Sequence, residues 1–272
     1  MTNPADADPP KSPAGERIAK VLARSGVASR RGAEAIIAQG RITVNGKIID
    51  SPALNVMPDD TILFDGKPIK AAEKTRVWRY YKPIGLVTTE SDEKGRDTVF
   101  DALRDQLPRV VSVGRLDINS EGLLLLTNDG GLKRLLELPK TGWMRKYRVR
   151  VKGIPTDDRL APLRAGITVD GEKFRPMQVI IDRQQGANAW LTIGLREGKN
   201  REIRRALAEI SFQVSRLIRI SYGPIRLGEM QPGEVDEIRG QVLRDQLGKM
   251  LPDPPEPEAK PKSVKPKLRK RQ

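Results

Sequence analysis

The chain has 272 residues, a formal net charge of +15, and neither cysteine nor histidine. Without these two side chains, disulfides, a thiolate nucleophile, a Cys/His zinc site and an imidazole base are all excluded. Any chemistry must therefore use carboxylates, tyrosine, lysine, arginine or hydroxyl groups.

Positive charge is spread along the chain rather than confined to its end. Residues 259–272 hold seven Lys or Arg and no acidic residue, and removing these seven charges from the total of +15 leaves +8. A basic folded body favours a polyanionic partner such as nucleic acid. The sequence has no long apolar run and no signal-peptide pattern at its N-terminus. We therefore expect a cytoplasmic protein with no membrane segment.

Both ends are predicted to be disordered. Residues 1–14 combine prolines with small polar residues and have no apolar pattern. Residues 247–272 are rich in proline and end in the basic run. Such a tail is typical of a solvated arm, with non-specific phosphate binding as the alternative. Between the ends we expect two domains, over residues 15–72 and 73–246.

The first domain is predicted to be a helix–helix–hairpin unit. Apolar spacing predicts helices over residues 16–25 and 30–39, the second capped by Ser29. Residues 42–44 alternate as a strand, and the pair Asn45-Gly46 indicates a tight hairpin turn.

Two arginines, Arg30 and Arg31, fall in the first turn of the second helix, where the helix dipole disfavours cations but attracts phosphate. The segment Ala19-Lys-Val-Leu-Ala-x-x-Gly-Val-Ala-Ser-Arg-Arg, followed by Glu34-x-Ile-Ile-x-x-Gly-x-Ile-x-Val-Asn-Gly, resembles the S4 RNA-binding domain. The alternative for such charges is an ordinary solvated helix face. The resemblance implies contacts with structured RNA from these cations: Lys20, Arg30, Arg31 and Arg41.

Strands outnumber helices in the second domain. We predict helices over residues 98–104 and 200–210. The predicted strands cover residues 77–81, 86–89, 123–126, 146–152, 190–195 and 214–220. This pattern indicates a mixed, largely antiparallel sheet rather than a doubly wound one, and hence an α+β protein.

The run from residue 113 to 130 contains the most informative pattern. It places Asp117 between Arg115 and a turn that leads into the apolar strand at 123–126. A charged pair beside a buried strand is costly unless each charge is compensated. From the residues alone, a structural Arg–Asp ion pair and a catalytic carboxylate both remain possible interpretations.

The phrase Gly114-Arg-Leu-Asp-x-x-Ser-x-Gly-Leu-Leu-Leu-Leu-Thr-Asn-Asp-Gly closely resembles the active-site signature of the RsuA/RluB-type pseudouridine synthases. The likeness covers residues 17–238 and includes Lys146-x-Tyr-x-Val and Arg196-Glu-Gly-Lys-Asn-Arg-Glu-Ile-Arg-Arg. It implies an isomerase that converts a uridine of ribosomal RNA, expected in the large subunit, to pseudouridine. It also implies a monomer that uses neither cofactor nor metal.

The resemblance assigns roles residue by residue. Asp117 would be the catalytic carboxylate, acting as nucleophile or as base at the sugar. Arg115 would fill the space left by the flipped uridine, Tyr147 would stack on the base, and Arg204 would pair with Asp117. Leu217 would wall the base pocket. Ordinary core packing remains the alternative for Tyr147 and Leu217.

Three more cations are assigned by the resemblance to RNA phosphates: Lys199, Arg201 and Arg205. Other functions stay open at this point, namely a small-subunit rRNA pseudouridine synthase and a non-catalytic RNA-binding ribosome-assembly factor. A hydrolytic N-glycosidase would want a second carboxylate to activate water. Glu121 and Asp129 are candidates, but an apolar run separates them.

Overall fold

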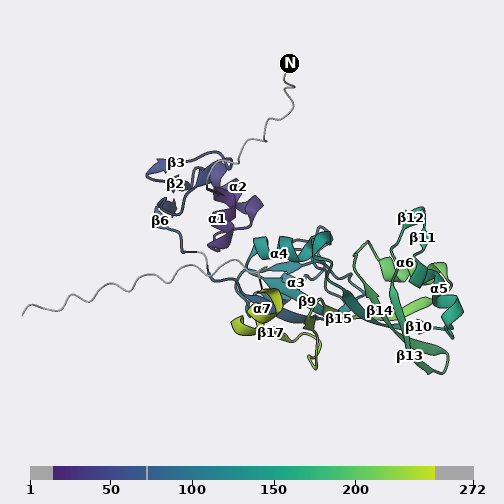
Figure 1. The fold of residues 1–272 in the computed structure, drawn as a ribbon. Helices are drawn as coiled ribbons and strands as arrows, with labels where there is room; N and C mark the ends of the chain where they lie inside the picture. Colours follow the sequence, from purple (N-terminus) through teal and green to yellow (C-terminus); the bar gives the residue numbers. More distant parts are fainter. Residues whose placement is uncertain (1–14, 72, 249–272) are drawn as a thin grey trace, which may run out of the picture.

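The structure, a computed structural model, describes residues 15–71 and 73–248 (Figure 1). It contains a small N-terminal unit of helices and hairpins and a larger unit built on one sheet. Residues 1–14, and all but the first two residues of the predicted tail 247–272, lie outside the described residues.

The N-terminal unit consists of two helices and two small sheets. Its helices are α1 (Ile18–Arg24) and α2 (Arg30–Ala38). One antiparallel sheet pairs β1 (Glu16–Arg17) with β4 (Asn55–Val56), and the other has the order β3 (Lys47–Ile48), β2 (Ile42–Val44), β5 (Ile62–Phe64) and β6 (Lys67–Pro68). Apolar side chains from both helices and from the strands form a core of their own.

Local signals in the sequence decide the shape of this unit. Ser29 accepts a hydrogen bond from the backbone N–H of Gly32 at 3.0 Å, which is the predicted N-cap of α2. Asn45 and Gly46 have φ angles of 50° and 78°, and they form the predicted tight turn between β2 and β3. The first helix begins at Ile18, two residues later than predicted, because the residues before it pair with β4 as β1.

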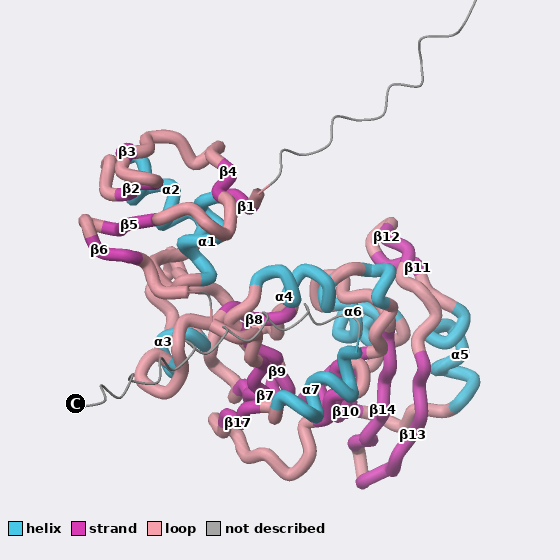
Figure 2. The backbone as a smooth tube through the Cα atoms, turned by 60° about the vertical axis from the view of Figure 1, so that its left-hand side comes forward, coloured by secondary structure: helices cyan, strands magenta, loops and turns pink. Residues whose placement is uncertain are grey.

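A nine-stranded sheet organises the larger unit (Figure 2). Its strands are β7 (Val77–Lys82), β8 (Val111–Val113), β9 (Glu121–Thr127), β10 (Arg145–Lys152), β13 (Gln178–Gln185), β14 (Asn188–Leu195), β15 (Gln213–Tyr222), β16 (Ile225–Arg226) and β17 (Val235–Glu237). The order along the sheet is β13-β14-β10-β15-β9-β7-β17, with β8 paired to β9 and β16 to β15. Pairing is antiparallel throughout except between β15 and β9, which confirms the predicted mixed, largely antiparallel sheet.

Helices pack on both faces of this sheet. The helical segments are α3 (Val99–Leu103), α4 (Gly130–Glu137), the 3₁₀ turn η1 (Pro139–Thr141), α5 (Asp157–Ala165), α6 (Glu202–Glu209) and α7 (Gly240–Leu247). A hairpin of β11 (Thr168–Val169) and β12 (Glu172–Lys173) lies next to α5 and α6 (Figure 1). These two helices cover β10, β13 and β14, and their leucines and isoleucines share one core with those strands.

Two sequence predictions for the larger unit were wrong. The predicted strand at 86–89 is a loop in which only Val87 forms an isolated bridge. The Thr88 hydroxyl donates to the Leu116 carbonyl at 2.9 Å. This carbonyl is therefore bonded by a side chain and not by the backbone N–H of a neighbouring strand. Helix α6 begins at Glu202 rather than at residue 200, because Arg201 has a left-handed backbone with φ of 47°.

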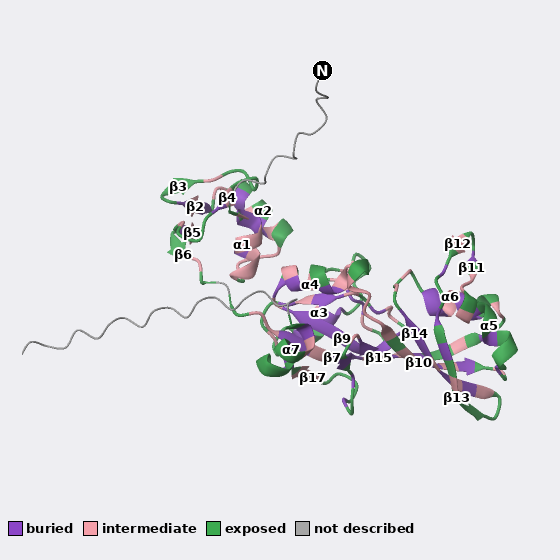
Figure 3. Cartoon of the chain, viewed as in Figure 1, coloured by how far each residue is buried: buried purple, intermediate pink, exposed green. Residues whose placement is uncertain are grey.

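The strand β9 is buried along its whole length (Figure 3). Leu123 and Leu125 belong to the core on one side of the sheet, together with α4 and α7. Leu124 and Leu126 belong to the core on the other side, together with α3. The strand therefore serves as the shared centre of two cores, as its continuous apolar run predicts.

We expect Gly122→Ala to destabilise the protein strongly. Gly122 has φ of +98°, and an added Cβ would lie 2.5 Å from the Arg219 carbonyl oxygen and 2.8 Å from the Arg219 nitrogen. The substitution would force β9 and β15 apart at their parallel pairing, in addition to the backbone strain of about 1–3 kcal/mol. Thermal melting measures the effect.

Gly233→Ala is the matched control for this substitution. Gly233 has φ of +88° but open space around its missing side chain, so it reports the backbone strain without the clash. If the melting temperature fell by the same amount in both variants, the close approach of β9 and β15 would not limit stability.

Candidate active site

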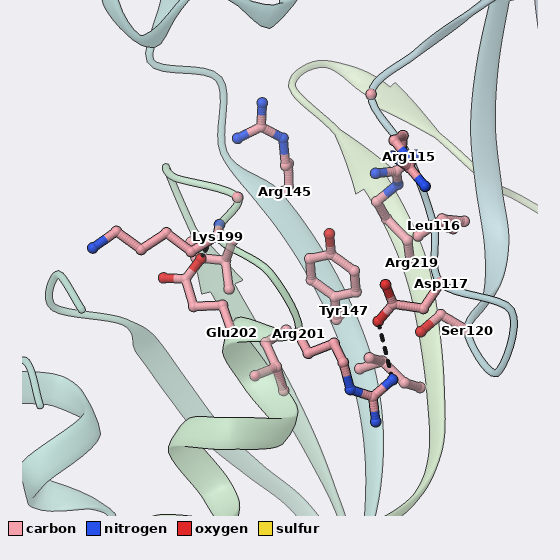
Figure 4. Close-up of a pocket in the computed structure, with 15 residues that line it drawn as sticks. Arg115, Leu116, Asp117, Ser120, Arg145, Tyr147, Lys199, Arg201, Glu202 and Arg219 are labelled. Atoms are coloured by element: carbon pink, nitrogen blue, oxygen red, sulfur yellow. Dashed lines mark hydrogen bonds and ion pairs between the residues drawn. The ribbon is translucent and has the colours of Figure 1, made fainter. Parts of the chain in front are cut away.

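A cavity of about 150 Å³ opens between the turn before β9, the start of β10 and the start of α6 (Figure 4). Cations outnumber carboxylates in its lining. The cations are Arg115, Arg145, Lys199, Arg201 and Arg219, and the carboxylates are Asp117 and Glu202. A cavity with this excess of positive charge suits an anionic ligand.

Asp117 lies in the turn between β8 and β9 and lines this cavity. Its carbonyl accepts a hydrogen bond from the Ser120 backbone N–H at 3.0 Å, which closes the turn. The Asp117 carboxylate is about one third exposed, and its Oδ2 lies 3.6 Å from Nη1 of Arg201 (Figure 4). The carboxylate is therefore reachable from solvent and lies beside one cation, Arg201, which directly precedes α6.

The guanidinium within 4 Å of the Asp117 carboxylate is that of Arg201, whereas the predicted partner was Arg204. Arg204 instead donates to the carbonyls of Asn119 at 2.7 Å and Val214 at 3.2 Å. Burial lowers the pKa of the Arg204 guanidinium and the charge of Arg201 adds to this, while Asp117 acts in the opposite direction. Arg204 thus holds the backbone of the turn, and Arg201 holds the carboxylate.

Other residues predicted for the site meet in the same cavity. Tyr147 on β10 and Leu217 on β15 line it beside Asp117, and Leu217 is buried. Both residues also pack in the core shared with α5 and α6. Arg115 is exposed and lines the cavity together with a groove of about 810 Å³ that adjoins it. Lys199 lines both spaces as well.

Arg205 lies outside this cavity lining. Its guanidinium donates to Glu172 at 2.6 Å and to Asp170 at 3.2 Å, and it stacks 4.9 Å from the centre of the Phe174 ring. The predicted phosphate contact from Arg205 would therefore compete with two carboxylates that the structure places beside it.

The cations predicted for RNA binding in the N-terminal unit divide into two kinds. Lys20 forms an ion pair with Glu16, and Arg41 makes a bidentate pair with Asp65 at 2.9 and 2.5 Å. By contrast, the side chains of the first turn of α2, at positions 30 and 31, are exposed. Among the described residues, neither of these two arginines forms an ion pair with a carboxylate.

Lys82 was not among the residues predicted for the site, and its ammonium group contacts the Asp117 turn. Its side chain is fully buried, and its Nζ donates to three carbonyls, those of Pro83 at 2.9 Å, Asp117 at 3.2 Å and Ser120 at 2.9 Å. Burial lowers the pKa of Lys82 to about 8, although the charges of Asp117 and Glu121 oppose this shift. A Lys-Pro pair at the end of a buried strand was the available signal for it.

Glu121 is also buried next to the site, but its oxygens are fully engaged. Tyr81 donates to it at 2.9 Å, and Arg216 makes two hydrogen bonds to it at 2.6 and 3.0 Å. Burial alone would raise the pKa of the Glu121 carboxyl, and the hydrogen bonds from Arg216 and Tyr81 outweigh burial and lower it. Glu121 is therefore a paired structural carboxylate and a poor candidate for activating water.

Two further buried charges line the cavity. Glu202 accepts a hydrogen bond from the Lys199 backbone N–H at 3.0 Å, and burial raises the pKa of its carboxyl to about 7. Arg219 donates through Nε to the Leu123 carbonyl at 2.7 Å and lies 5.3 Å from the centre of the Tyr222 ring. These two residues fix the floor and the α6 side of the cavity.

Within residues 15–71 and 73–248, acidic side chains nowhere gather into a group of three that could hold a metal ion. In the same part of the chain, every helix is too short or too polar to cross a membrane.

Two family models match this chain. The model for RNA pseudouridylate synthases matches residues 76–209, and the model for the S4 domain matches residues 16–62. A solved structure described as a pseudouridylate synthase aligns with a TM-score of 0.61 and 25% identity, covering 85% of this chain and 99% of that one. The two resemblances inferred from the sequence are thereby confirmed.

Proteins with similar sequences agree with these models. An uncharacterized RNA pseudouridine synthase of Rickettsia prowazekii is 44% identical over 231 residues, which cover 85% of this chain and 97% of that protein. The ribosomal large subunit pseudouridine synthase B of Yersinia pestis is 42% identical over 224 residues, covering 80% of this chain and 70% of that protein. The chain therefore belongs to the RNA pseudouridine synthases of the RsuA/RluB type, isomerases with an N-terminal S4 domain.

Proposed function

We propose that this pseudouridine synthase isomerises a uridine of large-subunit ribosomal RNA and that Asp117 is its catalytic carboxylate. The choice of RNA rests on relatives such as the Yersinia pestis protein, which is named for the large ribosomal subunit. The observation that carries the catalytic proposal is the position of Asp117 in the cavity, beside Tyr147 and Leu217 and 3.6 Å from Arg201.

The reaction needs a positioned carboxylate and little else. The N1–C1′ bond of uridine breaks, the uracil turns, and C5 forms a bond to C1′. C5 then loses its proton and N1 gains one, so that product and substrate contain the same atoms. Asp117 acts at the nucleoside, either as nucleophile or as base at the sugar, and the cavity holds the uracil while it turns.

The target uridine must leave its RNA stack to reach this carboxylate, which costs a few kcal/mol. Tyr147 would stack on the flipped base, and Leu217 would form the opposite apolar wall. Arg115 is exposed at the mouth of the cavity, where it would fill the vacated space and contact phosphate.

Two arginines of the α6 region would position Asp117 in different ways. Arg201 supplies the counter-charge for the carboxylate at 3.6 Å. Arg204 fixes the turn through the Asn119 carbonyl, and its charge also interacts with that of Asp117. This division replaces the direct Arg204–Asp117 pair expected from the sequence.

RNA phosphates would be bound on both sides of this site. The exposed pair Arg30 and Arg31 at the start of α2 is the main candidate in the S4 domain, because Lys20 and Arg41 already have carboxylate partners. Next to the cavity, the groove lined by Arg115 and the segment 198–201 would take the strand that flanks the target.

Nucleoside analysis tests the proposed reaction and its substrate. Unmodified transcripts of the large-subunit and small-subunit rRNAs are treated with the protein, digested and separated by reverse-phase chromatography. We expect pseudouridine from the large-subunit transcript, and mapping would locate it at one uridine. Modification of the small-subunit transcript alone would refute the choice of RNA, and release of free uracil would refute isomerisation.

We expect Asp117→Asn to abolish pseudouridine formation while leaving RNA affinity nearly unchanged. The amide preserves the shape of the side chain but removes the ionised carboxylate that reacts. Single-turnover assays and filter binding with the same transcript measure the two properties. Turnover of this variant above a trace would show that the carboxylate is not required.

We expect Tyr147→Phe to keep most of the binding of the flipped base, because a phenyl ring still stacks. Tyr147→Ala should lose about 1–3 kcal/mol of stacking. The KM and kcat of both variants, measured on the mapped substrate, separate the two effects. If both substitutions changed KM and kcat equally, the functional group of Tyr147 would be its hydroxyl and not its ring.

We expect Lys82→Met to destabilise the protein by about 1–3 kcal/mol, since three carbonyls lose their donor. Burial lowers the pKa of Lys82 from its ordinary 10.5 to about 8, so between these values the unfolded chain binds one more proton than the native one. Wild-type stability relative to the variant should therefore rise as the pH increases from about 8 to about 10.

Melting temperatures of the two proteins across this pH range measure that difference. Lys67→Met, which removes an exposed lysine of the S4 domain, reports the effect of losing any one lysine. A difference in melting temperature between wild type and Lys82→Met that stays constant with pH would contradict the lowered pKa of Lys82.

A further inference from the structure

The face of β10 that points away from the Asp117 cavity carries a row of cations. Lys146, Arg148, Arg150 and Lys152 alternate along the strand with inward residues such as Tyr147, which lines the cavity. Because successive side chains of a strand point to opposite faces, these four cations lie on the other side of the sheet from the site. Three of them are exposed and Arg150 is half-buried.

The strand register extends this row across the sheet. Arg150 lies opposite Trp190 of β14 on one side and Arg216 of β15 on the other. Trp190 in turn lies opposite Arg183 of β13. We call the resulting surface the basic sheet face, and its members are Lys146, Arg148, Arg150, Lys152, Arg183 and Trp190.

The charges of the basic sheet face are not neutralised within the described part of the chain. None of its five cations has a carboxylate oxygen within 4 Å there, although such pairs hold other arginines, including Arg76 and Arg96. Its nearest acidic neighbour along the chain, Asp182, accepts a hydrogen bond from the Thr192 hydroxyl at 3.0 Å. Five uncompensated cations on one face mark a surface that attracts polyanions.

The basic sheet face also offers apolar contact. The Arg148 guanidinium lies 5.0 Å from the centre of the Trp190 ring, which holds this cation over the indole. Ile180 of β13 is 60% exposed, and it lies opposite Thr192, whose partner on β10 is Arg148. With a single aromatic residue, phosphate contacts would dominate over base stacking.

We propose that the basic sheet face is a second RNA-binding surface, which contacts the phosphates of an rRNA segment other than the one that presents the target uridine. The segment in the cavity meets Tyr147 and Leu217 on one face of the sheet, whereas this surface lies on the other. The inference rests on the proposed substrate, because only a large folded RNA supplies both segments. Binding there is electrostatic and independent of sequence.

A variant that removes three charges from this face tests the proposal. Arg148→Ala, Arg150→Ala and Lys152→Ala are combined in the full chain, and binding is titrated against salt. The probes are the complete large-subunit rRNA transcript and a short hairpin that carries the mapped uridine. For the complete transcript, the slope of log affinity against log salt should flatten by about 2 units.

The short hairpin should show an unchanged slope and unchanged turnover, because it cannot reach the far face. As the matched control, Arg226→Ala on β16 is combined with Arg239→Ala and Arg244→Ala at α7, and these three changes, called the α7 variant, remove the same charge from exposed positions. Equal slopes for wild type and the β10 variant, or equal losses for the β10 and α7 variants, would overturn the proposal.

Site-specific cross-linking gives a readout that does not depend on charge removal. The chain has no cysteine, so Gln213→Cys, opposite Lys152 on β15, introduces a single thiol for a photoreactive label. We expect cross-links to transcript nucleotides outside the target hairpin, above those from Asp245→Cys on α7. Cross-links confined to the target hairpin, or none above the control, would refute a second surface.

Both readouts measure binding and not product. If nucleoside analysis found no pseudouridine in large-subunit rRNA, the proposed substrate would fail on that result alone. The salt slopes and cross-links would still decide whether the basic sheet face binds RNA.

Discussion

The position of Asp117 depends on a buried ammonium group. Lys82 lies fully inside the protein and donates to three carbonyls, two of which belong to the turn from Asp117 to Ser120. An isolated buried ammonium would cost several kcal/mol, and the three carbonyl dipoles offset that cost only while the turn keeps its shape. This turn leads into β9, whose side chains pack into one core on each side of the sheet. The Asp117 carboxylate is thus placed by its backbone, and its side chain remains about one third exposed beside Arg201.

The three arginines of the α6 region show why a helical pattern does not determine a residue's role. Their spacing predicts one common basic face. Instead, Arg201 precedes the helix with a left-handed backbone and reaches Asp117. Arg204 is half-buried against carbonyls, and Arg205 meets the β11–β12 hairpin through Glu172. The sequence therefore pointed to the arginines of this region, but it could not assign a partner to each of them, because their partners lie on other elements.

The parts of the fold that were predictable are those decided by neighbours in the chain. The cap at Ser29, the turn at Asn45-Gly46 and the apolar run of β9 each contain their own signal. The burial of Glu121 had no such signal, and that of Lys82 had only the Lys-Pro pair at the end of its strand, since each is a charged residue at the end of a buried strand. What holds Glu121 is Arg216, 95 residues away. Burial of a charge is decided by its partners, and distant partners cannot be read from local spacing.

The positive residues of the chain differ in whether a carboxylate of the fold neutralises them. Arg41, Arg76 and Arg96 are positive residues that the fold already neutralises, so they add little to the field outside the protein. Among the described residues, cations without a carboxylate partner include those at the start of α2, several that line the cavity and those on the outer face of β10. With only 4% aromatic residues, the chain has few rings on which RNA bases could stack. If the substrate is the proposed large RNA, its phosphates would be recognised mainly by these unpaired cations. Contacts at separate places would then restrict the orientation in which a uridine can reach Asp117.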